Sequence, residues 1–146
     1  MSKKELKLDS PYLLEGEKIV EDRGSISFVN EFDFPKVKRF YVITSKKGVV
    51  RAWHGHKHEA KYVFAISGSA LVGAVRIDNW KHPSKNAKLC SFLLSSQKPA
   101  ILFIPKGYAN GFKSLTDDAK LMFFSTKTLL ESKRDDIRFD SKYWDI

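Results

Sequence analysis

Three histidines stand at alternate positions in the segment RAWHGHKHEAKY, residues 51–62. They are His54, His56 and His58, in a chain with four histidines in all. Imidazole is the commonest metal ligand in proteins, and its unperturbed pKa of about 6.5 suits it to proton transfer near neutrality. The segment therefore predicts a metal site, an acid–base site, or the solvated end of a strand.

Short strands divided by turns dominate the chain that must position these histidines. Runs rich in β-branched and aromatic residues predict strands at 38–45, 62–67, 70–77, 87–96, 100–105 and 119–127. Gly68 marks a turn, and only LLESKRDD (129–136) could form a short helical turn. This pattern favours an all-β fold, a sandwich or barrel of antiparallel strands with little helix. Because alternate residues of a strand face the same side, His54 and His56 should point inward together.

The composition is that of an ordinary globular protein. With 146 residues and 42% hydrophobic residues, the chain fits one domain, 1–146, that buries a core. Cys90 is the only cysteine and cannot form an internal disulfide, and the first residues lack an apolar run of signal-peptide length. We therefore expect a cytoplasmic protein. No segment approaches the ~20 apolar residues of a membrane helix, so we expect no membrane partner.

The net charge of +9 favours an anionic partner. The lysines are spread along the chain, whereas nucleic-acid binding favours basic residues clustered on a helix or stripe with aromatic residues between them. We therefore expect the partner to be a phosphate-bearing small molecule. We do not expect nucleic acid, because only the net charge supports nucleic-acid binding.

The spacing around the histidines resembles the first motif of the cupin superfamily, a jelly-roll β-barrel. That motif reads Gly-x5-His-x-His, then a glutamate, and then a glycine six residues further on. Here Gly48 precedes His54 and His56, Lys61 stands at the glutamate position, and Gly68 closes the motif. One of the superfamily's metal ligands is therefore replaced by a cation.

The second cupin motif, Pro-x-Gly-x2-His, is matched by residues 105–110 except at its last position, which is Asn110. A divalent metal prefers neutral imidazoles and carboxylates, and the ammonium of Lys61 would repel it. We therefore expect no functional metal and no other cofactor. Glu59 could replace the missing carboxylate, which keeps a metal site as the lesser alternative.

Longer segments resemble dTDP-4-dehydrorhamnose 3,5-epimerases, over roughly residues 21–140. EDRG (21–24) is similar to that family's DERG, VVRAWHGH (49–56) to its VLRGLHYQ, and FIPKGYANGFKSL (103–115) to its WIPEGFAHGFLTL. A sister family, the nucleotide-sugar 3,4-ketoisomerases, has a signature like KRVYYI…RGxHAHK. The segment KRFYVITSKKGVVRAWHGHK (38–57) resembles that signature more closely than the epimerase one.

The resemblance implies an isomerase acting on a nucleotide-diphosphate-linked 4-keto-6-deoxy sugar, in deoxysugar and surface-polysaccharide biosynthesis. The keto group acidifies neighbouring C–H bonds, and a histidine can remove such a proton. His54 matches the family's base, and Lys61 its cation beside the enolate oxygen. Asp140 is our candidate for the acid that orients His54, and His56 is a candidate second proton carrier.

Four further residues are expected to bind substrate. Arg23 and Arg51 match family positions that contact the sugar diphosphate or the enolate region, and the arginine fork suits phosphate. Tyr108 and Asn110 come from the FIPKGYANGF segment. Because Arg51 lies three residues before His54, both can face inward only if the strand carries a bulge. The resemblance also implies a homodimer paired through N-terminal strands.

The resemblance fails at one catalytic position. The 3,5-epimerases return the proton from a tyrosine on the opposite face of the sugar, and Thr128 and Leu129 stand in its place. This loss favours a 3,4-ketoisomerase, or a single epimerisation in which water or another tyrosine is the acid. A non-catalytic sugar-binding cupin is the competing class of protein.

Overall fold

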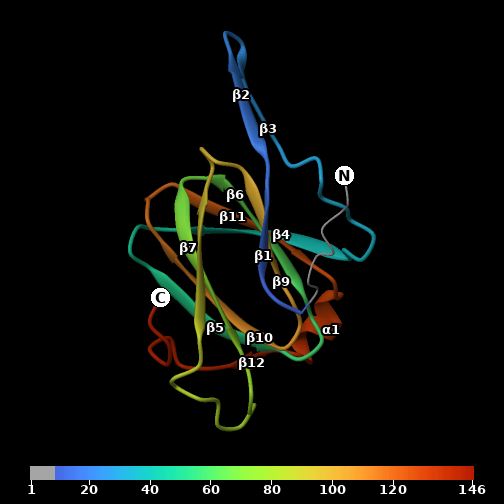
Figure 1. Ribbon diagram of the computed structural model, residues 1–146, viewed down its shortest axis with the longest axis vertical. Coiled ribbons are helices and arrows are strands. Elements are labelled where there is room, and N and C mark those ends of the chain that lie inside the picture. Colours follow the sequence, from blue (N-terminus) through green and yellow to red (C-terminus); the bar gives the residue numbers. More distant parts are fainter. Residues whose placement is uncertain (1–8) are drawn as a thin grey trace.

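Two five-stranded antiparallel sheets pack face to face in the computed structural model, which describes residues 9–146 (Figure 1). The first sheet has the strand order β1 (Tyr12–Glu15), β9 (Ala100–Ile104), β6 (Lys61–Ser67), β11 (Ala119–Ser125), β4 (Arg39–Ser45). The second has the order β12 (Ile137–Arg138), β5 (Val50–His56), β10 (Tyr108–Ser114), β7 (Ser69–Arg76), β8 (Leu89–Ser95). Most neighbours within a sheet are far apart in the chain. The expected jelly-roll double sheet is confirmed, while residues 1–8 of the expected domain 1–146 lie outside the described part.

The six strands predicted from composition lie where the sequence places them, within two residues at each end. Gly68 occupies the expected turn between β6 and β7 with φ +66°, a conformation that favours glycine. The predicted helical turn is α1 (Leu129–Lys133). Its N-cap is Thr128, whose hydroxyl accepts from the backbone N–H of Glu131, while the Glu131 carboxylate accepts from the backbone N–H of Thr128. Across residues 9–146 no helix has the length and apolarity needed to cross a bilayer.

The main core fills the space between the two sheets. It is built from inward-facing side chains of alternate residues, such as Val63 and Leu121 of the first sheet and Val72 of the second, all at most 1% exposed. Each such burial stabilises the fold by about 1.5–3 kcal/mol. Phe112 and Phe123 belong to this core and also line a cavity, so the core forms the floor of that cavity.

A second apolar cluster covers the outer face of the second sheet. Trp53 of β5 is 1% exposed and packs there against Trp144, whose backbone carbonyl accepts a hydrogen bond from the Trp53 indole N–H at 3.1 Å. Gly55 lies on the same face, where an added Cβ would stand 2.7 Å from the ring of Trp80. Because Trp53 and Gly55 face outward into this cluster, His54 and His56 must face inward.

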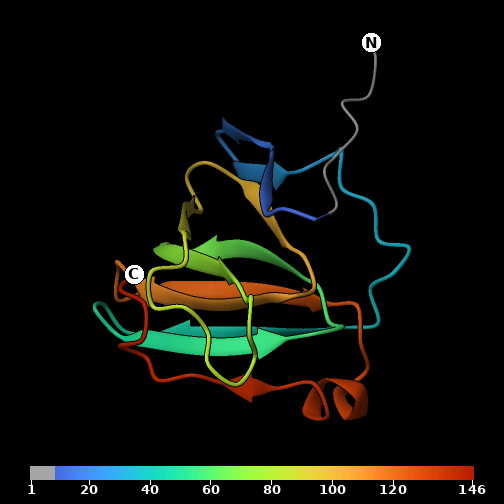
Figure 2. The same cartoon turned by 60° about the horizontal axis from the view of Figure 1, so that its bottom comes forward.

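A two-stranded hairpin, β2 (Glu17–Glu21) and β3 (Gly24–Phe28), projects from the barrel (Figures 1 and 2). It carries three exposed apolar side chains, Ile19, Val20 and Ile26, which are 51%, 74% and 59% exposed.

Candidate active site

A cavity of about 420 Å³ opens between the sheets. The second sheet contributes Arg51, His54 and Asn110 to its wall, and the first sheet contributes Tyr41 and Lys61. A smaller neighbouring pocket shares two of these residues and adds others: it is lined by Arg39, His54, His56, Glu59, Lys61, Leu129, Ser132, Lys133 and Asp136. Since His54 and Lys61 line both, the two hollows form one continuous site.

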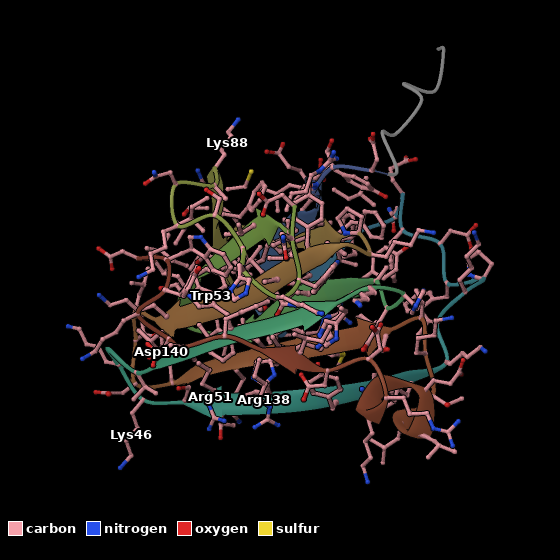
Figure 3. All side chains as sticks on the ribbon, turned by 90° about the horizontal axis from the view of Figure 1, so that it is seen from below. Lys46, Arg51, Trp53, Lys88, Arg138 and Asp140 are labelled. Carbon is pink, nitrogen blue, oxygen red and sulfur yellow. The ribbon has the colours of Figure 1, made fainter. Side chains whose placement is uncertain are left out.

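A β-bulge brings Arg51 and His54 to the same cavity. Asn110 of β10 pairs with His54, but Phe112, two residues later, pairs with Arg51, three residues earlier on β5. The extra residue on β5 breaks strict alternation, as the sequence required if both side chains were to face inward. Figure 3 shows the guanidinium groups of Arg51 and Arg138 on the same side of the molecule, with Trp53 further inside.

The imidazole of His54 contacts a carboxylate through one nitrogen, and its other nitrogen is available to substrate. Its Nδ1 lies 3.0 Å from Oδ1 of Asp136, and its side chain is 39% exposed. Nε2 has no hydrogen-bond partner among residues 9–146. A carboxylate at Nδ1 favours the neutral tautomer with its proton there, which leaves the Nε2 lone pair free to accept a proton.

Asp136 is ionised in this arrangement. Partial burial raises its pKa, but the hydrogen bonds from His54 and from Nε of Arg138 (3.1 Å) outweigh burial, so the pKa lies below its ordinary value. An ionised carboxylate at Nδ1 stabilises the imidazolium that forms when Nε2 takes up a proton.

The expectation that Asp140 orients His54 is corrected by this geometry. Arg138 pairs directly with His54 across β12 and β5, so Asp136 and Asp140, two residues to either side, are both diagonal neighbours of His54. The carboxylate of Asp140 instead accepts the backbone N–H of Lys142 at 2.8 Å, in the turn that follows β12. Asp136 is therefore the carboxylate in contact with His54.

His56 lies deeper in the same site, with its side chain 5% exposed. Its Nδ1–H donates to the backbone carbonyl of Asp135 at 2.6 Å. Burial lowers the pKa of His56, the nearby ammonium of Lys61 lowers it further, and together they outweigh the opposing carbonyl and carboxylates. His56 is thus neutral at physiological pH. Its buried Nε2 has no hydrogen-bond partner among residues 9–146.

Asp135 supports the loop that follows β5. Its carboxylate accepts three backbone N–H groups, from Lys57 (2.8 Å), His58 (2.8 Å) and Glu59 (2.9 Å). These charge-assisted bonds fix where β5 ends. Together with the His56 contact to its carbonyl, they make Asp135 the anchor of the inner part of the site.

Glu59, the carboxylate that could have completed a metal site, is buried in a network of its own. Ser125 Oγ donates to its Oε1 at 2.6 Å, and the Arg39 guanidinium lies 3.6 Å from the same oxygen. Its Oε2 stands 3.4 Å from Nδ1 of His56. Among residues 9–146, no group of three or more His, Cys, Asp or Glu side chains is arranged to hold a metal ion.

Lys61 is 8% exposed and faces the cavity from β6. Its Nζ donates to the phenol oxygen of Tyr41 at 2.9 Å and lies 5.8 Å from the centre of the Phe123 ring. The two aromatic rings stack at 5.2 Å with an interplanar angle of 3°. Lys61 is therefore a buried cation with one neutral partner, available to a negative charge in the cavity.

Of the four expected substrate-binding residues, two line the cavity and two do not. Arg51 and Asn110 line it, and Asn110 Nδ2 donates to the backbone carbonyl of His54 at 3.5 Å. Arg23 lies in the tip of the projecting hairpin, 86% exposed and paired with Glu21 at 2.6 Å. Tyr108 is buried in the main core, and its hydroxyl donates to the backbone carbonyl of Asp9 at 3.3 Å. Within one protomer, Arg23 and Tyr108 thus stand apart from the site.

Sequence reasoning missed Arg39, Tyr41 and Asp136, which line the site, and Asp135, which supports the adjoining loop. Arg39 and Tyr41 fall inside the KRFYVI run that resembles the ketoisomerase signature, which was a usable signal. The adjacent acids of SKRDDIRFD were a second signal, since a carboxylate is the common partner of a catalytic histidine.

Comparison with known proteins gives a consistent picture. The sequence model of the family described as dTDP-4-dehydrorhamnose 3,5-epimerase matches residues 6–146. A search of curated protein sequences finds no match. Among solved structures, a dTDP-4-dehydrorhamnose 3,5-epimerase from Sulfolobus tokodaii superposes with a TM-score of 0.78 at 24% identity, covering 99% of this chain and 84% of that one.

Two other solved structures share the fold. A 3'-monoepimerase from Streptomyces bikiniensis, in complex with dTDP-quinovose, has a TM-score of 0.67 at 23% identity, covering 87% of this chain and 69% of that one. A sugar 3,4-ketoisomerase from Thermoanaerobacterium thermosaccharolyticum, in complex with TDP, has a TM-score of 0.66 at 20% identity, covering 92% of this chain and 91% of that one. These likenesses confirm the fold, and the sequence match over residues 6–146 shows that the chain belongs to the dTDP-4-dehydrorhamnose 3,5-epimerase family, a family of isomerases.

Proposed function

We propose that this protein inverts a carbon next to the keto group of a nucleotide-diphosphate-linked 4-keto-6-deoxy sugar. The observation that carries the proposal is the His54–Asp136 pair, which opens onto a cavity that Lys61 lines from the opposite sheet. A base and a cation facing one hollow are what enolisation beside a carbonyl requires. A dTDP-linked sugar is supported by the family match and by the dTDP-type ligands of two structural relatives.

The reaction begins with transfer of the sugar's acidic C–H proton to Nε2 of His54. The electrons move into the keto oxygen, which becomes an enolate, and the ammonium of Lys61 stabilises its charge. Asp136 stabilises the imidazolium that has formed. Return of a proton to the opposite face of the same carbon then gives the epimer.

Arg51 and Asn110 are the residues of this protomer that we assign to substrate binding. Arg51 stands at the exposed rim of the cavity, where a guanidinium can bind the diphosphate while the sugar lies inside. Asn110 offers an amide to a sugar hydroxyl or keto oxygen.

We propose that the protein, one domain over residues 1–146, is a homodimer. The projecting hairpin exposes Ile19, Val20 and Ile26, an apolar surface that a second copy could cover. In such a dimer Arg23, at the hairpin tip, would bind the diphosphate in the partner's cavity. Light scattering that gives the mass of two chains supports this proposal, and a strict monomer rules it out. Free Cys90 agrees with a cytoplasmic location, which we also propose.

A 3,4-ketoisomerase is the second candidate, and one observation favours it. His56 lines the same pocket as His54, and its buried Nε2 has no partner among residues 9–146. Two imidazoles on one wall could move a proton between adjacent carbons of a single enediol, which needs no acid on the opposite face. Either activity would serve deoxysugar and surface-polysaccharide biosynthesis.

The deciding experiment is NMR of dTDP-4-keto-6-deoxyglucose incubated with the protein in D2O. Inversion with deuterium at C3, or at C3 and C5, supports the epimerase, and a 3-keto product supports the ketoisomerase. The His54→Ala variant is the control for the base. Absence of exchange with dTDP-, GDP-, UDP- and CDP-linked 4-keto sugars would contradict both activities and favour a non-catalytic sugar-binding protein.

A further inference from the structure

Inversion at carbon needs a proton donor on the face opposite the base, and no residue has yet been assigned to that role. His54 and His56 both come from β5 in the second sheet. Leu129 lines the smaller pocket and has no proton to give, and Thr128 caps α1 with its hydroxyl. A donor that belongs to the protein must therefore come from the wall that the first sheet contributes.

Tyr41 is the acidic hydroxyl on that wall. It lies on β4, at the edge of the first sheet, and lines the cavity together with His54 of the second sheet. Of the other cavity groups with N–H protons, the Lys61 ammonium is already assigned to the enolate oxygen, the guanidinium of Arg51 does not deprotonate in proteins, and the amide of Asn110 is not an acid. Tyr41 thus faces the cavity from the sheet opposite that of His54.

The contact between Lys61 and Tyr41 sets the direction of the phenol proton. The two polar atoms are 2.9 Å apart, and an ammonium has no lone pair to accept a bond. Lys61 therefore donates, the phenol oxygen accepts, and the phenol's own proton is free to donate elsewhere. Lys61 is the single hydrogen-bond partner of the Tyr41 hydroxyl among residues 9–146, so none of these residues accepts the phenol proton.

The ring of Tyr41 is held in place by two neighbouring side chains. Phe123 stacks on it at 5.2 Å, nearly parallel, and the Arg39 guanidinium lies 4.9 Å from its centre. A ring packed in this way keeps its hydroxyl at a fixed point in the cavity wall, which is what a proton donor to a defined carbon requires.

We propose that Tyr41 is the general acid of the epimerisation, an assignment that rests on the function proposed above. His54 removes the proton from one face of the carbon, and the Tyr41 hydroxyl gives its proton to the opposite face. The enzyme is left with an imidazolium, paired with Asp136, and a phenolate, paired with the Lys61 ammonium. Loss of the imidazolium proton to solvent and uptake of a proton by the phenolate restore both groups.

The test compares exchange with inversion in Tyr41→Phe, using dTDP-4-keto-6-deoxyglucose in D2O. The substitution removes one oxygen and keeps the stacked ring. We expect deuterium to enter unreacted substrate within about threefold of the wild-type rate, because His54 still removes and returns protons on its own face. Inversion should fall at least about a hundredfold, the usual contribution of a positioned acid. Retained exchange also shows that the variant is folded.

The matched control is Tyr62→Phe. Tyr62 lies on β6 of the same sheet but faces outward, against Phe103, and should change neither rate. Inversion by Tyr41→Phe at a rate near that of the wild type overturns the assignment, as does equal loss of exchange and inversion. If the wild-type protein neither exchanges nor inverts any 4-keto sugar, the proposed function fails instead.

Discussion

His54 and His56 are two residues apart on β5, face the same pocket, and have opposite environments. His54 is 39% exposed at its side chain and contacts a carboxylate, whereas His56 is 5% exposed and contacts a backbone carbonyl. Burial and Lys61 lower the pKa of His56. One strand therefore presents an accessible imidazole paired with an acid beside a buried imidazole that is neutral and fixed.

Burial and neighbouring charges, and not the residue type, distinguish the two imidazoles. An ionised carboxylate stabilises a developing imidazolium, so His54 can gain a full charge during the reaction. His56 has the Asp135 carbonyl and the Glu59 carboxylate near Nδ1, but burial and the Lys61 ammonium outweigh them, so charging His56 costs desolvation. We infer that His54 is the base, and that His56 is held neutral at the inner end of the site.

The largest effect should come from removing the accessible imidazole. We expect His54→Ala to lower kcat about 10²–10⁴-fold, the contribution of a positioned base. Steady-state turnover of dTDP-4-keto-6-deoxyglucose measures the effect, and circular dichroism checks the fold. Turnover within tenfold of the wild type would show that another group removes the proton.

The second-largest effect is expected from changing Asp136, the carboxylate in contact with His54. In Asp136→Asn the amide can donate to Nδ1, which would place the imidazole proton on Nε2 and block proton uptake. We expect kcat to fall about tenfold to a hundredfold, part of what the base contributes. Asp140→Asn is the matched control, because Asp140 bonds a turn N–H instead. An equal loss in the two variants would contradict the assignment of Asp136.

Removing the Asp135 carboxylate, which anchors the loop after β5, should lower the stability of the fold. Asp135→Asn leaves one oxygen where two now accept three backbone N–H groups. We expect the free energy of unfolding to fall by about 1–3 kcal/mol, the cost of an unpaired buried donor. Urea denaturation measures it. Asp117→Asn, which alters one exposed bond to the N–H of Lys47, is the control and should change little. If the two variants have the same free energy of unfolding, the Asp135 carboxylate does not stabilise this loop.

The smallest expected effect is on the pH dependence of the free energy of unfolding, to which His56 contributes. Its pKa is lowered in the folded protein, so below about pH 6.5 the unfolded chain binds more protons and stability falls as the pH falls. His56→Gln should reduce this slope between pH 7 and 5 by up to about 1.4 kcal/mol per pH unit. Asp136, whose lowered pKa matters only below about pH 4, does not enter this window. An unchanged slope in urea denaturation would show that His56 is not held neutral.

The fold and one wall of the site could be predicted from sequence. Strand composition, turn residues and the histidine spacing gave the double sheet and the inward direction of His54 and His56. The spacing of Arg51 even indicated the bulge that the pairing of β5 with β10 contains. These features are local, and a local pattern is visible in a single sequence.

The opposite wall could not be predicted, because it depends on contacts between distant strands. Asp136 and Asp140 are equivalent neighbours of His54 until the turn after β12 engages Asp140. Lys61 was found from its place in a motif, but its partner Tyr41 lies twenty residues earlier on another strand. Arg23 was predicted from a family resemblance, and only the folded chain shows that its hairpin projects from the barrel.

The most direct test of the division between the two histidines is the rate at which solvent deuterium enters dTDP-4-keto-6-deoxyglucose in D2O, followed by NMR. His54→Gln and His56→Gln are compared side by side with the wild type. We predict that His54→Gln loses at least about 99% of the exchange, whereas His56→Gln keeps it within about tenfold of the wild-type rate. Exchange that survives in His54→Gln and disappears in His56→Gln would assign the base to the buried histidine and contradict this account.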